Sequence, residues 1–220
     1  MKQIIKNQEP EDFQDWKLLA NDDWQPSWTG MPGDIKRSLH HSLIAEQGGI
    51  CCYCGRRIDA GESHIEHFRP RGRNSFPDLE IVYTNLLASC QREVKPGAPL
   101  HCGKKKGKWF NEQLTLSPLD AESEHHFRFG SNGPIMPQDE GDDGARQTID
   151  HLGLDIDKLR ALRKSAIEGV ISELDTLSDQ DLGRLISGFT ERDSTGKFPE
   201  FCIPIVSVLR ELQGAACQAA

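Results

Sequence analysis

Apolar residues recur at helical spacing near the start of the chain. The stretch DIKRSLHHSLIAEQGG is therefore predicted to form an amphipathic helix. Its apolar face carries Ile35, Leu39, Leu43 and Ile44. Asp34 is the expected N-cap, and Gly48-Gly49 is the expected end. The residues before it, NDDWQPSWTGMPG, are dense in Pro and Gly and predict a loop.

The C-terminal third has a similar helical pattern. DIDKLRALRKSAIEGVISELDTL predicts an amphipathic helix. The apolar stripe comprises Leu159, Leu162, Ile167, Val170, Ile171 and Leu174. DQDLGRLISGFT and FPEFCIPIVSVLREL predict two further helices. Upstream, FRFGSNGPIMP predicts a hairpin around Ser131-Asn132-Gly133, and DEGDDGARQTID is interpreted as an acidic connector.

The middle of the chain has short segments instead of long periodic ones. ICCYCGRRI predicts a knuckle-type turn, and SHIEHFRP predicts a short strand stopped by Pro70. LEIVYTNLLASC predicts a strand or short helix that leads to Cys90. HCGKKKGKWF predicts the start of a helix with exposed basic residues. Short strands between helical flanks indicate an α+β fold.

Charge is unevenly distributed along the chain. The 220 residues carry a net charge of −8. Residues 51–110 hold 11 Lys and Arg against 6 Asp and Glu, a net +5, which leaves −13 for the rest. A basic island in an acidic protein favours a local nucleic-acid site. The sequence shows no apolar run of bilayer length and no signal-peptide pattern, so a cytoplasmic protein without membrane association is expected.

Seven cysteines are an odd number, so disulfides cannot pair them all. In a chain of cytosolic character, closely spaced cysteines favour a metal site. The predicted zinc shell consists of Cys51, Cys54, Cys90 and Cys102. Four thiolates satisfy the tetrahedral preference of zinc. Two alternatives remain open at this point, because Cys52 could replace Cys51 and His101 could replace Cys102.

The order of motifs HIEHFRP, YTNLL and SC…HCGKKKG resembles the zinc-containing HNH nuclease family, from about Ile50 to Phe110. The resemblance implies a ββα-metal, treble-clef-like core with a structural zinc. LIAEQGGICCYCGRRI and NLLASC extend the similarity to the PtuB-like HNH subunit of Septu anti-phage systems and to retron-associated HNH proteins. That narrower resemblance implies an anti-phage effector with a PtuA-like ATPase partner.

The family motif assigns roles to individual residues of this sequence. His67 matches the general base, since a near-neutral imidazole can deprotonate water. Glu66 matches the acidic ligand of a catalytic Mg²⁺ or Mn²⁺, because carboxylates suit hard cations. Asn85 matches the residue that holds the loop presenting His67. Lys106 matches a lysine that faces the phosphate.

One position departs from the family pattern. Many relatives carry Asn or His as a metal ligand directly after the final cysteine, where this chain has Gly103. His64 and His101 are the candidates to replace that ligand, and His64 shares a strand face with Glu66. Contacts to the nucleic-acid backbone are expected from Arg69, Arg71, Arg73, Lys104, Lys105 and Lys108.

The sequence thus predicts three segments. Residues 1–48 form a helical extension, residues 49–112 the zinc-supported nuclease core, and residues 113–220 a hairpin with a helical region. The expected function is metal-dependent cleavage of nucleic acid, with DNA favoured. Cleavage of RNA such as tRNA is one alternative, and a non-catalytic zinc module that binds nucleic acid is another. Glu66 distinguishes a nuclease from the non-catalytic module, because a carboxylate in a phosphate-binding groove repels the ligand unless a cation intervenes.

Overall fold

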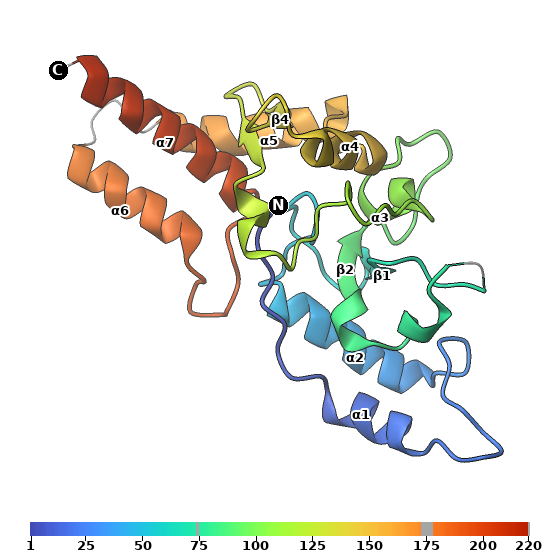
Figure 1. The fold of residues 1–220 in the computed structure, drawn as a ribbon. Coiled ribbons are helices and arrows are strands. Elements are labelled where there is room, and N and C mark those ends of the chain that lie inside the picture. The colour runs from blue at the N-terminus through green and yellow to red at the C-terminus, as the bar shows by residue number, and fades with distance from the viewer. Residues whose placement is uncertain (74, 173–177, 220) are drawn as a thin grey trace.

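Two antiparallel strands lie at the centre of the molecule, with helices on either side of them (Figure 1). The computed structural model describes residues 1–73, 75–172 and 178–219. Helices α1 and α2 lie beside one end of the strand pair, and α4, α5, α6 and α7 lie beyond the other (Figure 1). The predicted α+β class is confirmed.

The central pair is β1 (Ser63–His67) with β2 (Leu86–Cys90). Their register places Glu66 opposite Leu87 and His67 opposite Leu86. Strand β2 is buried along its whole length, which explains its unbroken apolar start. The short helix α3 (Cys102–Lys106) follows β2, and 3-10 turns η1 (Pro77–Leu79) and η2 (Tyr83–Asn85) fill the connection between the strands.

The N-terminal region contains α1 (Glu11–Leu18) and α2 (Gly33–Glu46). The predicted α2 face is confirmed, because Leu39 and Leu43 are fully buried. The predicted end is also confirmed, since Gly48 adopts a φ of 63° that favours glycine. The predicted cap is wrong: Pro32 occupies the N-cap position, and Asp34 lies in the first turn. A carboxylate in the first turn still stabilises the helix, because it lies near the positive end of the helix dipole.

The predicted hairpin is confirmed as β3 (Phe127–Phe129) paired with β4 (Ile135–Pro137), and the 3-10 turn η3 (Ala121–Glu124) precedes it. The predicted acidic connector is wrong, because its second half forms α4 (Asp143–Leu152). The Asp142 carboxylate caps α4 by accepting from the Ala145 amide, and Gly153 ends it in the left-handed conformation. These two capping residues stabilise the ends of α4, so the segment is helical despite its acidic residues.

Among the described residues that follow α4, three helices are present: α5 (Asp157–Ile171), α6 (Asp179–Thr190) and α7 (Cys202–Ala219). They share a second apolar cluster, in which Ile167 of α5 and Ile186 of α6 meet Leu209 of α7. Leu162, which was expected on the buried stripe, is 36% exposed, and Leu174 lies outside the described residues. In the described part of the chain, no helix has the length and apolarity needed to span a bilayer.

Candidate active site and metal centre

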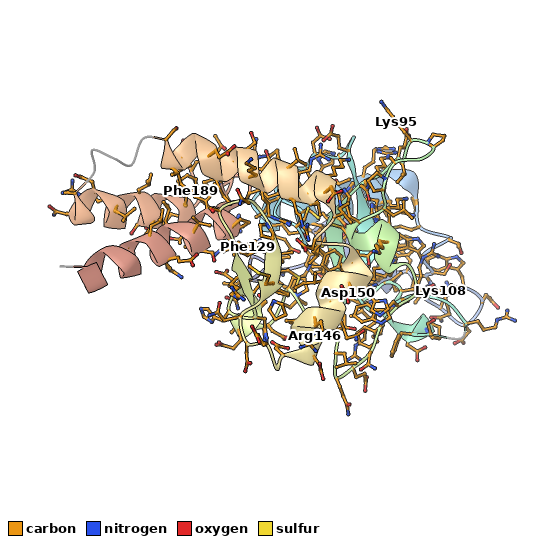
Figure 2. The ribbon with its side chains drawn as sticks, turned by 90° about the horizontal axis from the view of Figure 1, so that it is seen from above. Lys95, Lys108, Phe129, Arg146, Asp150 and Phe189 are labelled. Carbon is orange, nitrogen blue, oxygen red and sulfur yellow. The ribbon has the colours of Figure 1, made fainter. Side chains whose placement is uncertain are left out.

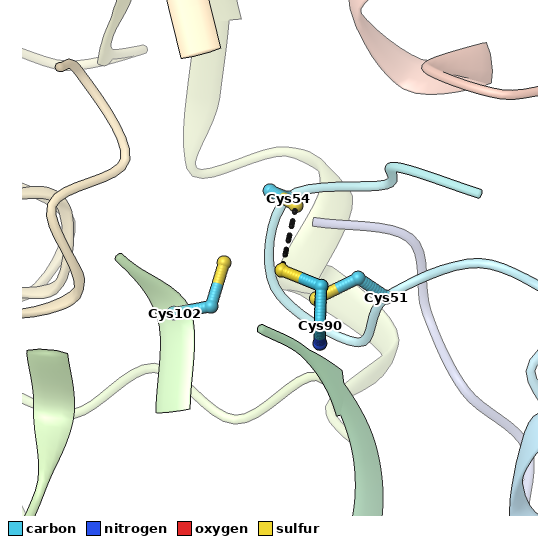
Figure 3. Close-up of side chains that lie close together, drawn as sticks. All are labelled: Cys51, Cys54, Cys90 and Cys102. Carbon is cyan, nitrogen blue, oxygen red and sulfur yellow. Dashed lines mark hydrogen bonds between the residues drawn. The ribbon is translucent and has the colours of Figure 1, made fainter. Parts of the chain in front are cut away.

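Four cysteine sulfurs converge where the loop before β1 meets the end of β2 and the start of α3 (Figure 3). Cys51, Cys54, Cys90 and Cys102 are all buried, and their sulfurs lie within 4.8 Å of one another. The Sγ atoms of Cys54 and Cys90 are 3.8 Å apart. A tetrahedron with zinc–sulfur bonds of about 2.3 Å has edges of about 3.8 Å. The four cysteines therefore form a shell that can hold a zinc ion.

The geometry bears on both alternative zinc ligands. Cys52 is buried, but its sulfur lies outside the four-sulfur group, and burial raises the pKa of its thiol well above the ordinary range. His101 lies against the group without joining it. Its Nδ1 is 3.6 Å from the sulfur of Cys90 and 3.3 Å from that of Cys102. His101 therefore lies beside the sulfur cluster. Its other predicted role, as a ligand of the catalytic ion, stays a prediction.

Strand β1 holds Glu66 in a buried, polar environment. Its Oε1 lies 2.9 Å from the Lys106 Nζ and accepts from the Tyr53 hydroxyl at 3.3 Å. Its Oε2 lies 3.6 Å from Nε2 of His64. Burial alone would raise the pKa of Glu66, but His64 and Lys106 outweigh it and hold the pKa below its ordinary value. Glu66 is therefore ionised although it is only 7% exposed.

Gly103 of α3 closes the other side of this pair. A Cβ atom at Gly103 would lie 2.5 Å from Oε2 of Glu66 and 2.9 Å from Nε2 of His64. The backbone of α3 thus approaches so closely that no side chain fits unless the pair moves. His64 projects from β1 beside Glu66, so an imidazole nitrogen and a carboxylate oxygen meet in the space that a side chain at position 103 would fill. This donor set suits a divalent cation.

His67 contacts a different group of residues. Its ring packs edge-on against Trp28, with centroids 4.4 Å apart, and its Nε2 lies 3.0 Å from the backbone carbonyl of Glu80. A carbonyl only accepts, so Nε2 carries the proton and Nδ1 carries the lone pair. Burial lowers the pKa of His67 to about 4, against the opposing effect of the Glu80 carbonyl. The ring is therefore neutral at pH 7, which is the form that can accept a proton.

Asn85 joins the two segments that flank His67. Its Oδ1 accepts from the amide of Arg69 at 2.8 Å. Its Nδ2 donates to the carbonyls of Arg69 and Leu79, each at 3.0 Å. The side chain therefore fixes the backbone just after β1 to the turn that precedes β2. Its catalytic relevance stays a prediction.

The basic residues fall into two groups. Lys106 is buried below the site, where it pairs with Glu66 and donates to the backbone carbonyl of His67 at 3.0 Å. This position differs from the phosphate-facing one that the family pattern implies. The remaining members are exposed, apart from the half-buried Arg69: Arg71, Arg73, Lys104, Lys105 and Lys108. Figure 2 labels Lys108, which lies just after α3.

Three residues that contact the site were missed from the sequence. Trp28 comes from the loop before α2, and its backbone amide donates to Oε1 of Glu80 at 2.9 Å. Glu80 then offers its own carbonyl to His67. Tyr53 lies within the CCYCG knuckle, so its position among the cysteines was the only available indication. Trp28 reaches the site through the fold, which no local pattern reveals.

The strand pair carries a buried carboxylate and two histidines, and a short helix follows it. Together with four cysteines that can hold a zinc ion, these are the features of an HNH module. The chain is 31% identical over 142 residues to a protein of Vibrio cholerae serotype O1 biovar El Tor, provisionally named as the HNH endonuclease of retron Vc95. The alignment covers 62% of this chain and 67% of that protein. The chain therefore belongs to the HNH endonuclease family. No protein-family model matches it.

Proposed function

We propose that the protein is a metal-dependent endonuclease that hydrolyses phosphodiester bonds in nucleic acid, with DNA favoured, and that residues 49–112 are its catalytic core. The observation that supports this most strongly is the buried, ionised Glu66 next to His64, on the strand that also presents a neutral His67. Lys106 pairs with Oε1 of Glu66, whereas Oε2 faces His64. A carboxylate oxygen in that position would repel a phosphate, so this arrangement favours a cation at the site.

Each residue then has a definite task. Glu66 and His64 would hold a divalent ion such as Mg²⁺ or Mn²⁺, which when bound would stabilise charge on the scissile phosphate. His67 accepts a proton from the attacking water at Nδ1, since its Nε2 donates to the Glu80 carbonyl. Lys106 binds both the Glu66 carboxylate and the His67 carbonyl, so it keeps the strand that carries both residues in place.

The direct test is nicking of a supercoiled plasmid in Mg²⁺ or Mn²⁺. His67→Ala should nick at least about a hundredfold more slowly than wild type, the range expected for loss of a general base. His125→Ala is the matched control, because this imidazole is exposed and bonds only to the nearby Glu122 carboxylate among described residues. Nicking by a clean His67→Ala preparation at the wild-type rate would remove the proposed base.

The substrate and the biological role are separate parts of the proposal. We infer a role as the effector of an anti-phage system with an ATPase partner, supported by the similarity to a retron protein. Labelled tRNA, offered beside plasmid DNA to wild type and His67→Ala, decides which polymer is cut. Co-purification with an ATPase encoded next to this protein, at low and high salt, tests the partner. Failure to co-purify at low salt would argue against it.

A further inference from the structure

A groove of about 540 Å³ opens beside the Glu66–His64 pair. One wall is α2, and the other consists of the start of β1 and the residues just before it. His64, the neighbour of Glu66, and Trp28, the neighbour of His67, both belong to its lining. The groove therefore borders residues that contact both halves of the candidate active site.

The lining of this groove is basic, although the chain is acidic. It contains Lys36, Arg37 and Arg92 together with His40, His41 and His64, and no Asp or Glu. In contrast, the whole chain has 34 acidic residues against 26 Lys and Arg. Among the described residues, none of these three cations forms an ion pair within 4 Å, whereas Arg56 nearby pairs with Glu62 at 3.7 Å.

Two cations gather on the Trp28 ring of the groove: Lys36, which belongs to the lining, and Arg71, which does not. The Nζ of Lys36 lies 4.0 Å from the ring centroid, and the Arg71 guanidinium lies 5.6 Å from it. Burial and the Arg71 charge lower the pKa of Lys36. Like charges held together repel one another, so an anion bound between them would be stabilised. Arg92 is also fixed, because its guanidinium donates to the carbonyl of Ala60 at 2.8 Å.

We propose that this groove binds the phosphate backbone of the nucleic-acid strand that runs to Glu66 and His64. The inference rests on the proposed function for its substrate class. It assigns substrate binding to α2, which lies outside the predicted nuclease core, in addition to the basic residues of the core itself. Contacts to phosphates give affinity without reading sequence, so the groove positions the strand and does not select a base.

The experiment is a binding titration of the full chain against fluorescein-labelled DNA and RNA, each single-stranded and duplex, without added divalent ions. Arg37→Glu/Arg92→Glu should weaken binding at least about tenfold. The slope of log K against log salt should fall by about 1.8 for duplex DNA, since each lost phosphate contact contributes about 0.9. Arg184→Glu/Arg210→Glu carries the same charge change at two exposed positions on α6 and α7, and should leave more of the binding intact.

Arg37→Gln/Arg92→Gln serves as a milder pair, and thermal melting of each variant verifies that it folds. Equal losses of affinity in the groove pair Arg37→Glu/Arg92→Glu and in the control pair Arg184→Glu/Arg210→Glu would overturn the proposal, because net charge alone would then explain binding. Wild-type affinity and salt slope in the groove pair would also overturn it. The proposed function can fail independently of the groove. If binding is tight and depends on the groove, but no cleavage occurs in Mg²⁺ or Mn²⁺, the binding proposal stands and the nuclease activity is contradicted.

Discussion

Gly103→Ala is the substitution that most directly tests the geometry of the candidate active site. The added Cβ would lie 2.5 Å from Oε2 of Glu66, whereas ordinary contact begins at 3.4 Å, so one of the two must move by about 0.9 Å. Glu66 has little freedom, because its Oε1 is bound by Lys106 and Tyr53. The displacement would therefore be transmitted to Lys106 and to the His67 carbonyl that it also binds.

A misplacement of about 1 Å can reduce turnover about a hundredfold. We expect Gly103→Ala to nick plasmid about that much more slowly, while its zinc content stays at the wild-type level because the four cysteines are unchanged. Gly183→Ala is the matched control, since this glycine also lies inside a helix but has open space where the Cβ would be. It should gain up to about 1 kcal/mol of stability and cut normally. Wild-type nicking by a folded, zinc-bound Gly103→Ala protein would refute the assignment of the reaction to this pair.

Two further predictions concern the supports of the fold. Cys54→Ser should lower the bound zinc from about one ion per chain and lower the melting temperature, because structural zinc contributes folding free energy. Cys202→Ser, at a buried cysteine outside the cluster, should keep its zinc, and retention of zinc by Cys54→Ser would contradict the ligand assignment. Asp142→Ala should cost about 1 kcal/mol at pH 7, because the carboxylate caps α4 at the Ala145 amide and bonds to His126. Burial opposes these contacts, but together they lower the pKa of Asp142 below its usual 3.8. Its contribution is therefore full above that value and is lost as the pH falls through the lower folded-state pKa. Denaturant titrations of wild type and Asp142→Ala should give the same free energy of unfolding below that pKa. A difference in free energy that does not change with pH would contradict a role for the ionised carboxylate.

Local patterns predicted the elements that depend on neighbouring residues. The knuckle, the short strand before Pro70 and the hairpin around Gly133 each rest on spacing within a dozen or so positions, and the structure contains all three. The helix α4 is hard to predict from its acidic first residues, which resemble a connector. Asp142 and Gly153 nevertheless mark its two ends in the sequence.

The site itself could be predicted only in part. The spacing of His64 and Glu66 on one strand correctly suggested a shared face, which their 3.6 Å separation reflects. The burial of Lys106 could not be foreseen, because it depends on how α3 packs on β1. Trp28 lies far from His67 in the sequence, and only the tertiary fold brings the two rings to 4.4 Å.

The contacts of α2 and the residues just after it with β2 explain why the strand pair of the candidate active site needs the N-terminal segment. The side-chain amide of Gln47, just after α2, brackets Ala88 of β2, accepting from its amide at 2.6 Å and donating to its carbonyl at 2.9 Å. Glu46 accepts from the Tyr83 hydroxyl at 2.8 Å and forms a buried ion pair with Lys6. Gln47 at Ala88 and Lys6 at the Leu86 carbonyl thus satisfy the outer edge of β2, which a two-stranded sheet would otherwise leave unpaired. A pair of strands is marginal alone, so its stability comes from the four cysteines at one end and from α2 along that edge. The same helix also forms one wall of the basic groove. In the proposed function, α2 therefore supports the strand pair of the candidate active site and also borders the substrate.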